Sequence, residues 1–401
     1  MVSVRQRLLA VCLAGCLLVA GCEAPAPSFA EIGPKPLPIV APGQEDIRAA
    51  MDRGIAFLLE AQNPNGSWGS SYPKPMTILM PIPGGYRAMY AGTTALCVMA
   101  LCEAAPDTPE VGQALQKAEQ WLFETLPKLR RDDIATIYSV WAHAYSIQAL
   151  LRLTDRFEGD VERSKKIHDF IELQIHLLGQ YQSLTGGWAY YERFTTTRRP
   201  NLISNSFVTA TVLIALHEAA EAGYDVPNRL PLLGMRSIRE ARHPDFSYGY
   251  YSLPIPEPTM PLHQKPSSLG RSQTCNAAMY LWGDKQTTLP IIRTWLDRLY
   301  ARNGWLSRAR KTQNPHESWF AVAGYFFYYG HYYAAICIDL LPAAERPHFQ
   351  DNLAHILLPL QEKDGSWWDF PVFRYHQEYG TAFALMSLQR CLRTSDQPSG
   401  R

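Results

Sequence analysis

The sequence predicts an all-α protein in which about twelve helices close into an (α/α)6 toroid. Two observations carry this prediction. Apolar residues recur with a helical period in segments that come in pairs, one amphipathic and one apolar nearly all round. A short motif, Gln-x-x-x-Gly-x-Trp, also recurs at residues 62–68, 182–188 and 361–367.

Each pair consists of an outer helix followed by an inner helix. A helix with charge along one stripe belongs at the surface of a domain, whereas one that is apolar nearly all round belongs in its interior. Six such pairs in a ring gather the amino-terminal ends of the inner helices around one mouth. The outer helices are expected at residues 45–61, 107–126, 160–181, 227–241, 286–301 and 343–361, and the inner ones at 88–104, 135–154, 203–222, 269–282, 317–340 and 376–392.

The motif falls at the turn from an outer to an inner helix. Its glycine ends the outer helix, and its glutamine can satisfy backbone groups left free at a helix terminus. Its tryptophan is expected to seal the seam between neighbouring hairpins, burying on the order of 200 Å². A fragment of the motif, Asn303-Gly304-Trp305, lies between the second and third copies.

The first residues have the features of an export signal. Arg5 and Arg7 precede an apolar run at residues 8–20, which is too short to span a bilayer. A lipoprotein-type cleavage site ends at Cys22, and an overlapping one at Cys16 would leave an apolar stretch of only about seven residues. Cys22 is therefore the expected lipidation site, and two or more acyl chains there would hold the protein on a lipid membrane. Cleavage by an ordinary signal peptidase is the alternative.

These observations divide the chain into four expected parts. They are a lipoprotein signal peptide at residues 1–22, a Pro/Ala-rich tether at 23–43, the toroid at 44–393 and a disordered tail at 394–401. The expected location is the bacterial cell envelope, where the protein would be exported and lipid-anchored.

Composition excludes several classes of partner. The 401 residues are 47% hydrophobic with a formal net charge of +1, which favours one globular unit and argues against nucleic acid as a partner. The cysteines after the signal lie inside apolar helical patterns and their number is odd, so they predict neither a disulfide framework nor a zinc pair. We expect no metal and no cofactor.

The first motif copy and the residues before it, Arg53-Gly54-Ile55-Ala56-Phe57 onward, resemble the glutamine-tryptophan repeat of the terpenoid cyclase and protein prenyltransferase superfamily. The resemblance covers residues 44–393 and is greatest to squalene-hopene cyclases over residues 361–388. It implies a toroid with an apolar ligand site. The catalytic Asp-x-Asp-Asp motif of those cyclases is degenerate here, because Arg130 stands where the first Asp would fall.

The resemblance also sets expectations for the acids and for metal. An arginine beside Asp132 and Asp133 would lower their pKa values by about 1 to 3 units, which opposes alkene protonation. We therefore interpret these aspartates as helix-start charges. The zinc-binding elements of the prenyltransferases are also incomplete, since Gln273 replaces an Asp and Gly380 replaces a His.

The starts of the inner helices mix polar and aromatic residues, and this is where a site is expected. For any single residue, helix capping is the simpler interpretation. The catalytic candidates are Asp132, Asp133, Glu317 and Glu378, of which Glu317 and Glu378 form the carboxylate pair at the inner mouth. The ligand-binding candidates are Tyr138, Trp141, Tyr145, Asn205, Arg271, Gln273, His316, Trp319 and Tyr379.

Three functions remain open from the sequence. The first is a membrane-tethered extracytoplasmic toroid that lacks cyclase activity and binds an apolar or amphiphilic small molecule, or an envelope protein, at its mouth. The second is an enzyme, either a divergent terpenoid cyclase or a hydrolase or lyase acting on extracellular glycans. The third is a purely structural envelope protein. An apolar open lumen favours the first, two carboxylates about 5 to 9 Å apart the second, and a side-chain-filled lumen the third.

Overall fold

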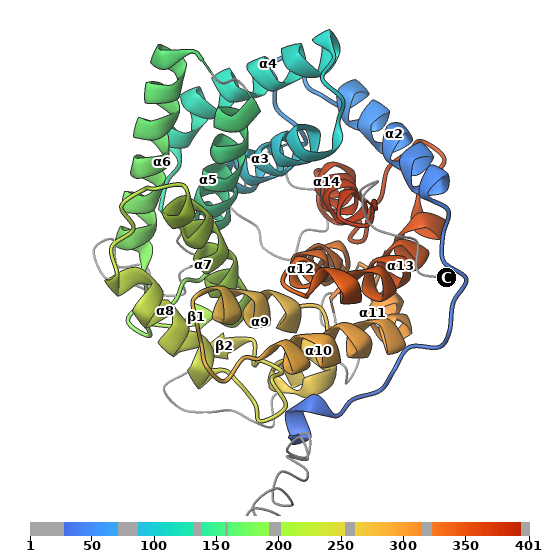
Figure 1. Ribbon diagram of the computed structural model, residues 1–401. Helices are drawn as coiled ribbons and strands as arrows, with labels where there is room; N and C mark the ends of the chain where they lie inside the picture. Colours follow the sequence, from blue (N-terminus) through green and yellow to red (C-terminus); the bar gives the residue numbers. More distant parts are fainter. Residues whose placement is uncertain are drawn as a thin grey trace, which may run out of the picture.

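The computed structural model describes residues 28–70, 87–131, 138–156, 159–191, 202–252, 261–313 and 323–393. Its long helices form two concentric rings (Figure 1), which confirms the predicted (α/α)6 toroid. The inner ring contains α3 (Arg87–Ala104), α5 (Ser139–Arg156), α7 (Ser206–Glu221), α9 (Ser272–Leu281), α12 (Phe327–Asp339) and α14 (His376–Gln389). The outer ring contains α2 (Gln44–Glu60), α4 (Pro109–Thr125), α6 (Val161–Tyr181), α8 (Arg229–Glu240), α10 (Leu289–Ala301) and α13 (Arg346–Leu357).

Shorter elements precede the first of these helices or occupy the turns between them. They are α11 (Asn303–Arg308), the antiparallel pair β1 (Ser204–Asn205) and β2 (Tyr251–Ser252), and the 3-10 turns η1 (Phe29–Glu31), η2 (Leu126–Lys128), η3 (Pro261–His263), η4 (Lys265–Ser268), η5 (Gly324–Phe326), η6 (Ala343–Glu345) and η7 (Leu358–Leu360).

Burial explains which helix lies in which ring. Outer helix α2 buries one stripe, formed by Ile47, Met51, Ile55 and Leu58, and exposes the charged remainder. Inner helix α7 is buried without interruption from its first residue through position 216. Inner helices contact one another in chain order, and α14 returns to α3 to close the ring. Within the described part of the chain, none of the helices combines the length and hydropathy of a membrane span.

The three motif copies make the same contacts. Each glutamine Nε2 donates to the carbonyl of its own motif glycine and to a carbonyl of the next outer helix around the ring, at 2.8–3.0 Å. Each tryptophan is fully buried, and its indole N–H donates to the carbonyl ten residues earlier. The glycines have φ between +88° and +91°, which a side chain rarely adopts. The seam prediction is therefore confirmed for Trp68, Trp188 and Trp367.

A fourth copy, which the sequence analysis missed, lies at Arg242, Phe246 and Tyr248. These residues have the spacing of the Gln, Gly and Trp, and the turn has the same backbone hydrogen bonds, with the N–H of residue 246 donating to His243 O at 3.0 Å. Phe246 has φ +60°, and Tyr248 is fully buried. All three side chains differ from the motif, so only the backbone reveals the copy. By contrast, Trp305 is 47% exposed on α11 and does not seal a seam.

The chain before α2 lies on the outer wall of the ring. Residues 28–43, here called the strap, run from η1 beside α10 to the start of α2 (Figure 1). Thr294 Oγ1 donates to Glu31 O at 3.1 Å, and Lys35 forms an ion pair with Asp297. The described part of the expected tether is therefore packed against the toroid.

Candidate functional site

Aromatic rings cover the mouth, where the inner helices begin. Tyr138, just before α5, stacks on Trp141 with ring centroids 5.5 Å apart and planes 8° apart. Trp141 also lies 6.0 Å from the ring of Tyr190 and 6.5 Å from that of Tyr329 on α12, across the ring. We call this layer the aromatic floor; it consists of Tyr138, Trp141, Tyr190, Phe207, Phe326, Tyr329 and Phe373.

Side chains fill the lumen beneath the floor in the part of the chain that the structure describes. Tyr145 lies 6.2 Å from Phe383, and Phe383 lies 5.2 Å from Tyr332. Tyr329 and Tyr333 are 4.7 Å apart, and all of these residues are buried. Tyr145, a predicted ligand-binding residue, thus belongs to the packing below the floor. A ligand would be held at the mouth and not in a deep channel.

Several mouth residues share one position in the repeat, two residues after the buried aromatic. This position holds Tyr190 in the third hairpin and Tyr250 in the fourth, and their hydroxyl groups are 3.1 Å apart. The next residues, Tyr191 and Tyr251, also face each other, with hydroxyl oxygens 3.5 Å apart. In the sixth hairpin the same position holds Asp369. The sequence analysis missed these residues, although the register of the repeat could have pointed to them.

Asp369 is the buried acid of the mouth. Its Oδ1 accepts a hydrogen bond from the hydroxyl of Tyr379, and its Oδ2 accepts the backbone N–H of Tyr328, at 3.2 Å, in the first turn of α12. Burial raises the pKa of Asp369 to about 7, although these donors and Arg310 act in the opposite direction. This acid therefore exchanges a proton near neutral pH while orienting Tyr379, one of the predicted ligand-binding residues.

Arg271 is fully buried and binds backbone carbonyls of the segment next to the mouth. Its guanidinium donates to the carbonyls of Tyr248, Leu262 and Ser267, and it lies 5.4 Å from the ring of Tyr250. Burial lowers its pKa to about 10. Because carbonyls of three different residues hold it, Arg271 fixes the segment that contains η3 and η4 against the mouth.

The remaining predicted residues are dispersed. Asn205 is buried in β1 and donates its N–H to Trp188 O at 2.9 Å. Gln273 points away from the mouth, since its amide donates to Trp295 O of outer helix α10 at 3.4 Å. Glu378 is half-buried on α14, where its carbonyl accepts a contact from Cys97 Sγ. Six predicted residues lie outside the described part of the chain: Cys22, Asp132, Asp133, His316, Glu317 and Trp319.

Metal-ligating side chains do not gather in the described residues, where no group of three or more His, Cys, Asp or Glu could hold an ion. The buried histidines serve packing. His143 Nδ1 lies 2.6 Å from Gln174 Oε1 of outer helix α6, and burial lowers its pKa to about 4. His331 has the same lowered pKa for the same reason.

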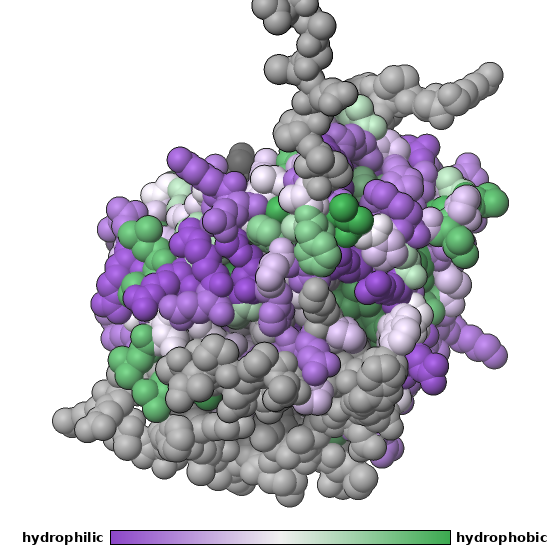
Figure 2. Space-filling model, turned by 90° about the horizontal axis from the view of Figure 1, so that it is seen from below, coloured by the Kyte–Doolittle hydropathy of each residue, from purple (hydrophilic) through white to green (hydrophobic). Residues whose placement is uncertain are grey.

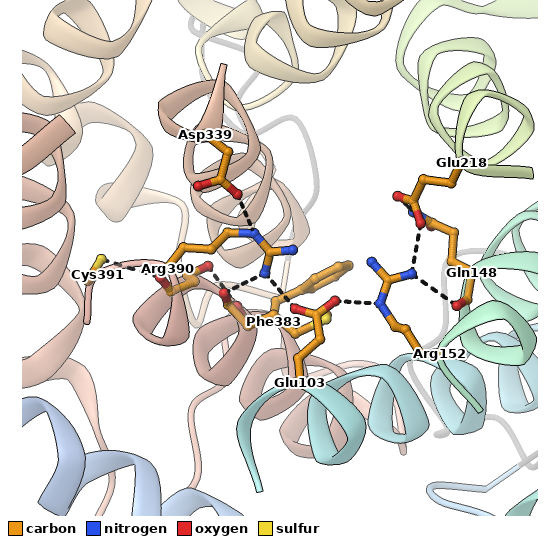
Figure 3. A network of polar contacts seen from close by, with 10 residues as sticks. Glu103, Gln148, Arg152, Glu218, Asp339, Phe383, Arg390 and Cys391 are labelled. Carbon is orange, nitrogen blue, oxygen red and sulfur yellow. Dashed lines mark hydrogen bonds and ion pairs between the residues drawn. The ribbon is translucent and has the colours of Figure 1, made fainter. Parts of the chain in front are cut away.

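The opposite end of the lumen is built from charges (Figure 3). Glu103 of α3 bonds Arg152 of α5 at 2.5 Å and Arg390, just after α14, at 2.6 Å. Arg152 continues to Glu218 of α7 at 2.7 Å, and Arg390 to Asp339 of α12 at 2.9 Å. Burial alone would raise the pKa of Glu103, but the two arginines outweigh it and the pKa is lowered. We call these five residues the far-end network; it ties five inner helices together.

Comparison with known proteins places this toroid in a structural class. No family model matches the chain, and no curated protein does. An α-1,6-mannanase from Salegentibacter sp., solved as an inactive variant with α-1,6-mannotriose, has a TM-score of 0.56 at 10% identity over 86% of this chain and 99% of its own. Cellobiose 2-epimerase from Spirochaeta thermophila also scores 0.56, at 14% identity over 87% and 97%. D-mannose isomerase scores 0.56, at 10% identity over 91% and 99%.

These neighbours correct the resemblance to squalene-hopene cyclases and to the terpenoid cyclase and prenyltransferase superfamily, which was wrong. The three solved toroids named above are a mannanase, a cellobiose epimerase and a mannose isomerase, and none of them is a terpenoid cyclase. The physical reason lies in the motif itself: its Gln and Trp bond backbone carbonyls and its Trp fills a seam between hairpins, so the contacts are structural. The motif therefore predicted architecture and carried no information about chemistry.

Proposed function

We propose that this protein is an enzyme that hydrolyses glycans at the mouth of the toroid. The observation that supports it most is the aromatic floor, which lies beside tyrosine hydroxyls and the buried acid Asp369 at the same end of the ring. The fold neighbours favour glycans over the apolar ligand expected first, because they act on mannose- and glucose-type saccharides.

An aromatic floor suits a sugar ring. The C–H faces of a pyranose are apolar and can lie flat on indole or phenol rings, whereas its hydroxyls need hydrogen-bond partners. Trp141 is half-buried and offers such a face, and its indole N–H has no hydrogen-bond partner among the described residues. The paired hydroxyls of Tyr190 and Tyr250 lie next to it.

The adjacent aspartates Asp132 and Asp133 are the proposed catalytic pair. Two described residues flank this pair in the chain. Arg131 lies 5.5 Å from the ring of Tyr181 at the end of α6, and the N–H of Tyr138 donates to Tyr190 O at 2.8 Å. Both points are at the mouth end. The mannanase variant that is described as inactive also carries replacements at two adjacent aspartates. In glycoside hydrolysis one carboxyl group protonates the leaving oxygen, while the other activates water or attacks the sugar.

The test is incubation of the purified protein with α-1,6-manno-oligosaccharides, cello-oligosaccharides and β-manno-oligosaccharides in ¹⁸O-labelled water, with mass spectrometry of the products. We expect shortened products that carry one ¹⁸O, and a loss of about 10² to 10⁴ in rate for Asp132→Asn or Asp133→Asn. The matched control is Asp169→Asn, an exposed aspartate on α6, which should leave the rate unchanged. Turnover that survives both mouth substitutions would reject this catalytic pair.

The aromatic floor also supports a second candidate, a glycan-binding protein without turnover, because stacking of a sugar on Trp141 needs no catalytic carboxylate. Calorimetric titration of the same oligosaccharides separates the two functions. Binding that is lost on Trp141→Ala, with no product from any substrate, would support the second candidate over the first. Absence of both binding and products would reject both.

A further inference from the structure

The strap exposes large apolar side chains on one short stretch of chain. Ile32 is 60% exposed, Leu37 84% and Val40 87%, and Phe29 is 68% exposed. The other five exposed side chains of this kind among the described residues are scattered over separate segments: Val161, Leu184, Leu202, Leu232 and Trp305. Single exposed apolar residues are ordinary, but four of them within one segment, residues 29–40, mark an interaction surface.

The strap carries almost no free charge. Its charged residues are Glu31, whose carboxylate accepts the N–H of Ser28 at 2.8 Å, and Lys35, which pairs with Asp297. Four prolines at positions 34, 36, 38 and 42 keep the segment extended and limit its conformations. The strap therefore offers a stiff, apolar and nearly neutral edge, unlike a basic patch that adsorbs to phosphates.

Contacts hold this edge to the toroid on its inner side. Arg298 Nη2 donates to Ile32 O at 3.4 Å, and Thr294 Oγ1 donates to Glu31 O. A Cβ at Gly33 would approach Thr294 Cγ2 to 2.9 Å, so the backbone lies directly on α10. The exposed side chains thus move with the whole toroid.

The expected anchor lies close to the strap in the chain. Cys22 precedes Ser28 by six residues, which span at most about 20 Å when fully extended. If the acyl chains of Cys22 enter a bilayer, Ser28 at the start of the strap must stay within that distance of the lipid surface. Other walls of the ring lie farther away, with α6 on the opposite side (Figure 1).

We infer that the strap is a lipid-facing surface that lays the toroid on its side against the membrane to which Cys22 anchors it. Phe29, Ile32, Leu37 and Val40 contact the bilayer, and the described surface on that side mixes hydrophilic residues with small apolar groups (Figure 2). In this orientation the mouth opens parallel to the membrane plane, so long glycans can enter it without meeting the bilayer. The inference rests on the expected anchor and is independent of catalysis.

The test uses the full-length protein, extracted from membranes and reconstituted into phosphatidylethanolamine and phosphatidylglycerol vesicles. A polarity-sensitive fluorophore on Val40→Cys is compared with the same label on Val161→Cys, which is 78% exposed at the start of α6. Doxyl lipids should quench the Val40 label at least about threefold more than the Val161 label, because collisional quenching requires close contact with the acyl region. The unsubstituted protein supplies the background, since the described cysteines are buried or half-buried.

A charge-insertion pair extends the test. Leu37→Glu with Val40→Glu should lower vesicle partitioning of the Cys22→Ser protein by roughly threefold or more, whereas Val161→Glu with Leu232→Glu should not. Equal quenching at Val40 and Val161 would overturn the side-on orientation. If the label at position 40 reports an apolar environment in the absence of vesicles, and light scattering gives the mass of a dimer, the surface contacts a second copy of the chain. This result would also overturn the side-on orientation.

Discussion

The two ends of the lumen are built from the same six inner helices and have opposite chemistry. At the mouth, neutral aromatic rings meet, and the buried acid Asp369 accepts an N–H from the first turn of α12. At the far end, charges alternate across five helices. Helix polarity accounts for part of the difference. Arg390 bonds the carbonyl of Met386 in the last turn of α14, where the helix dipole is negative, and Arg156 is a basic residue in the last turn of α5.

The difference separates stability from binding. Every charge in the far-end network is paired with an opposite charge of the same network, so these groups are not available to bind a ligand. At the mouth, by contrast, the indole N–H of the half-buried Trp141 has no hydrogen-bond partner among the described residues. Changes at the far end should therefore alter unfolding, whereas changes at the mouth should alter binding or proton exchange.

The largest expected effect is at the far end. Glu103→Ala removes the carboxylate shared by Arg152 and Arg390 and leaves two buried guanidinium groups without it. Each arginine keeps one acidic partner, Glu218 or Asp339, so the loss is that of two charge-assisted hydrogen-bonded pairs, about 1.5 to 3 kcal/mol each. Chemical denaturation monitored by circular dichroism measures this loss. An exposed carboxylate on α2, Glu45→Ala, is the control, and a Glu103→Ala midpoint equal to that of the control would contradict the assignment.

The second effect is a pH dependence carried by Asp369. Its folded pKa of about 7 lies above its ordinary value, so the folded state binds more protons than the unfolded state between those values. The contribution of Asp369 to the unfolding free energy therefore falls as pH rises from about 4 to about 8. Relative to Asp369→Asn, wild type should lose on the order of 3 kcal/mol over that interval. Parallel stability curves for the two proteins would show that burial does not hold the proton.

A smaller effect is expected in oligosaccharide affinity. Trp141→Ala removes the ring that stacks on Tyr138 and faces the mouth. We expect affinity to fall about tenfold, or roughly 1.4 kcal/mol, in calorimetric titration. Trp305→Ala, an exposed tryptophan on α11, should bind as wild type does. Equal affinities of the two variants would show that the oligosaccharide does not bind at the aromatic floor.

The smallest effect concerns the concealed fourth repeat. Phe246 occupies a left-handed conformation that costs a side chain about 1 to 2 kcal/mol. Phe246→Gly removes this strain and also the contact of the ring with Arg242, 4.6 Å away. Because the two effects oppose each other, the free energy of unfolding, measured by chemical denaturation, should change by no more than about 1 kcal/mol. Gly66→Phe is the opposite substitution at the equivalent position, and it should destabilise far more, because a Cβ there meets Lys117 O.

The architecture could be predicted because the helical period of the apolar residues and the repeated motif are both visible in short stretches of sequence. All twelve predicted helices are present, and the motif turns lie where they were expected. The chemistry could not be predicted in the same way. Gln273 was assigned to the mouth, but the rotation of α9 turns it toward α10, and no pattern in ten residues fixes that rotation.

The missed residues were hidden for different reasons. Tyr190 and Asp369 follow two of the recognised motif copies by two positions, so the register of the repeat could have pointed to them, whereas Tyr250 can be placed only when the fourth copy is recognised. The far-end network depends on partners from helices distant in sequence, such as Glu103 and Arg390. Single charges at the ends of apolar helices gave no indication that they converge.

The third motif copy has a consequence for how the chain folds. Gln361 bonds the carbonyl of Ala50, and the N–H of Arg393 donates to Gln44 Oε1 at 2.8 Å, so the last hairpin completes the first. Five hairpins can form from local contacts as synthesis proceeds, but α2 keeps an open edge until the final residues arrive. Joining the two ends and cutting the chain at another hairpin boundary should therefore preserve the ring, while removal of the last hairpin should leave an unclosed spiral.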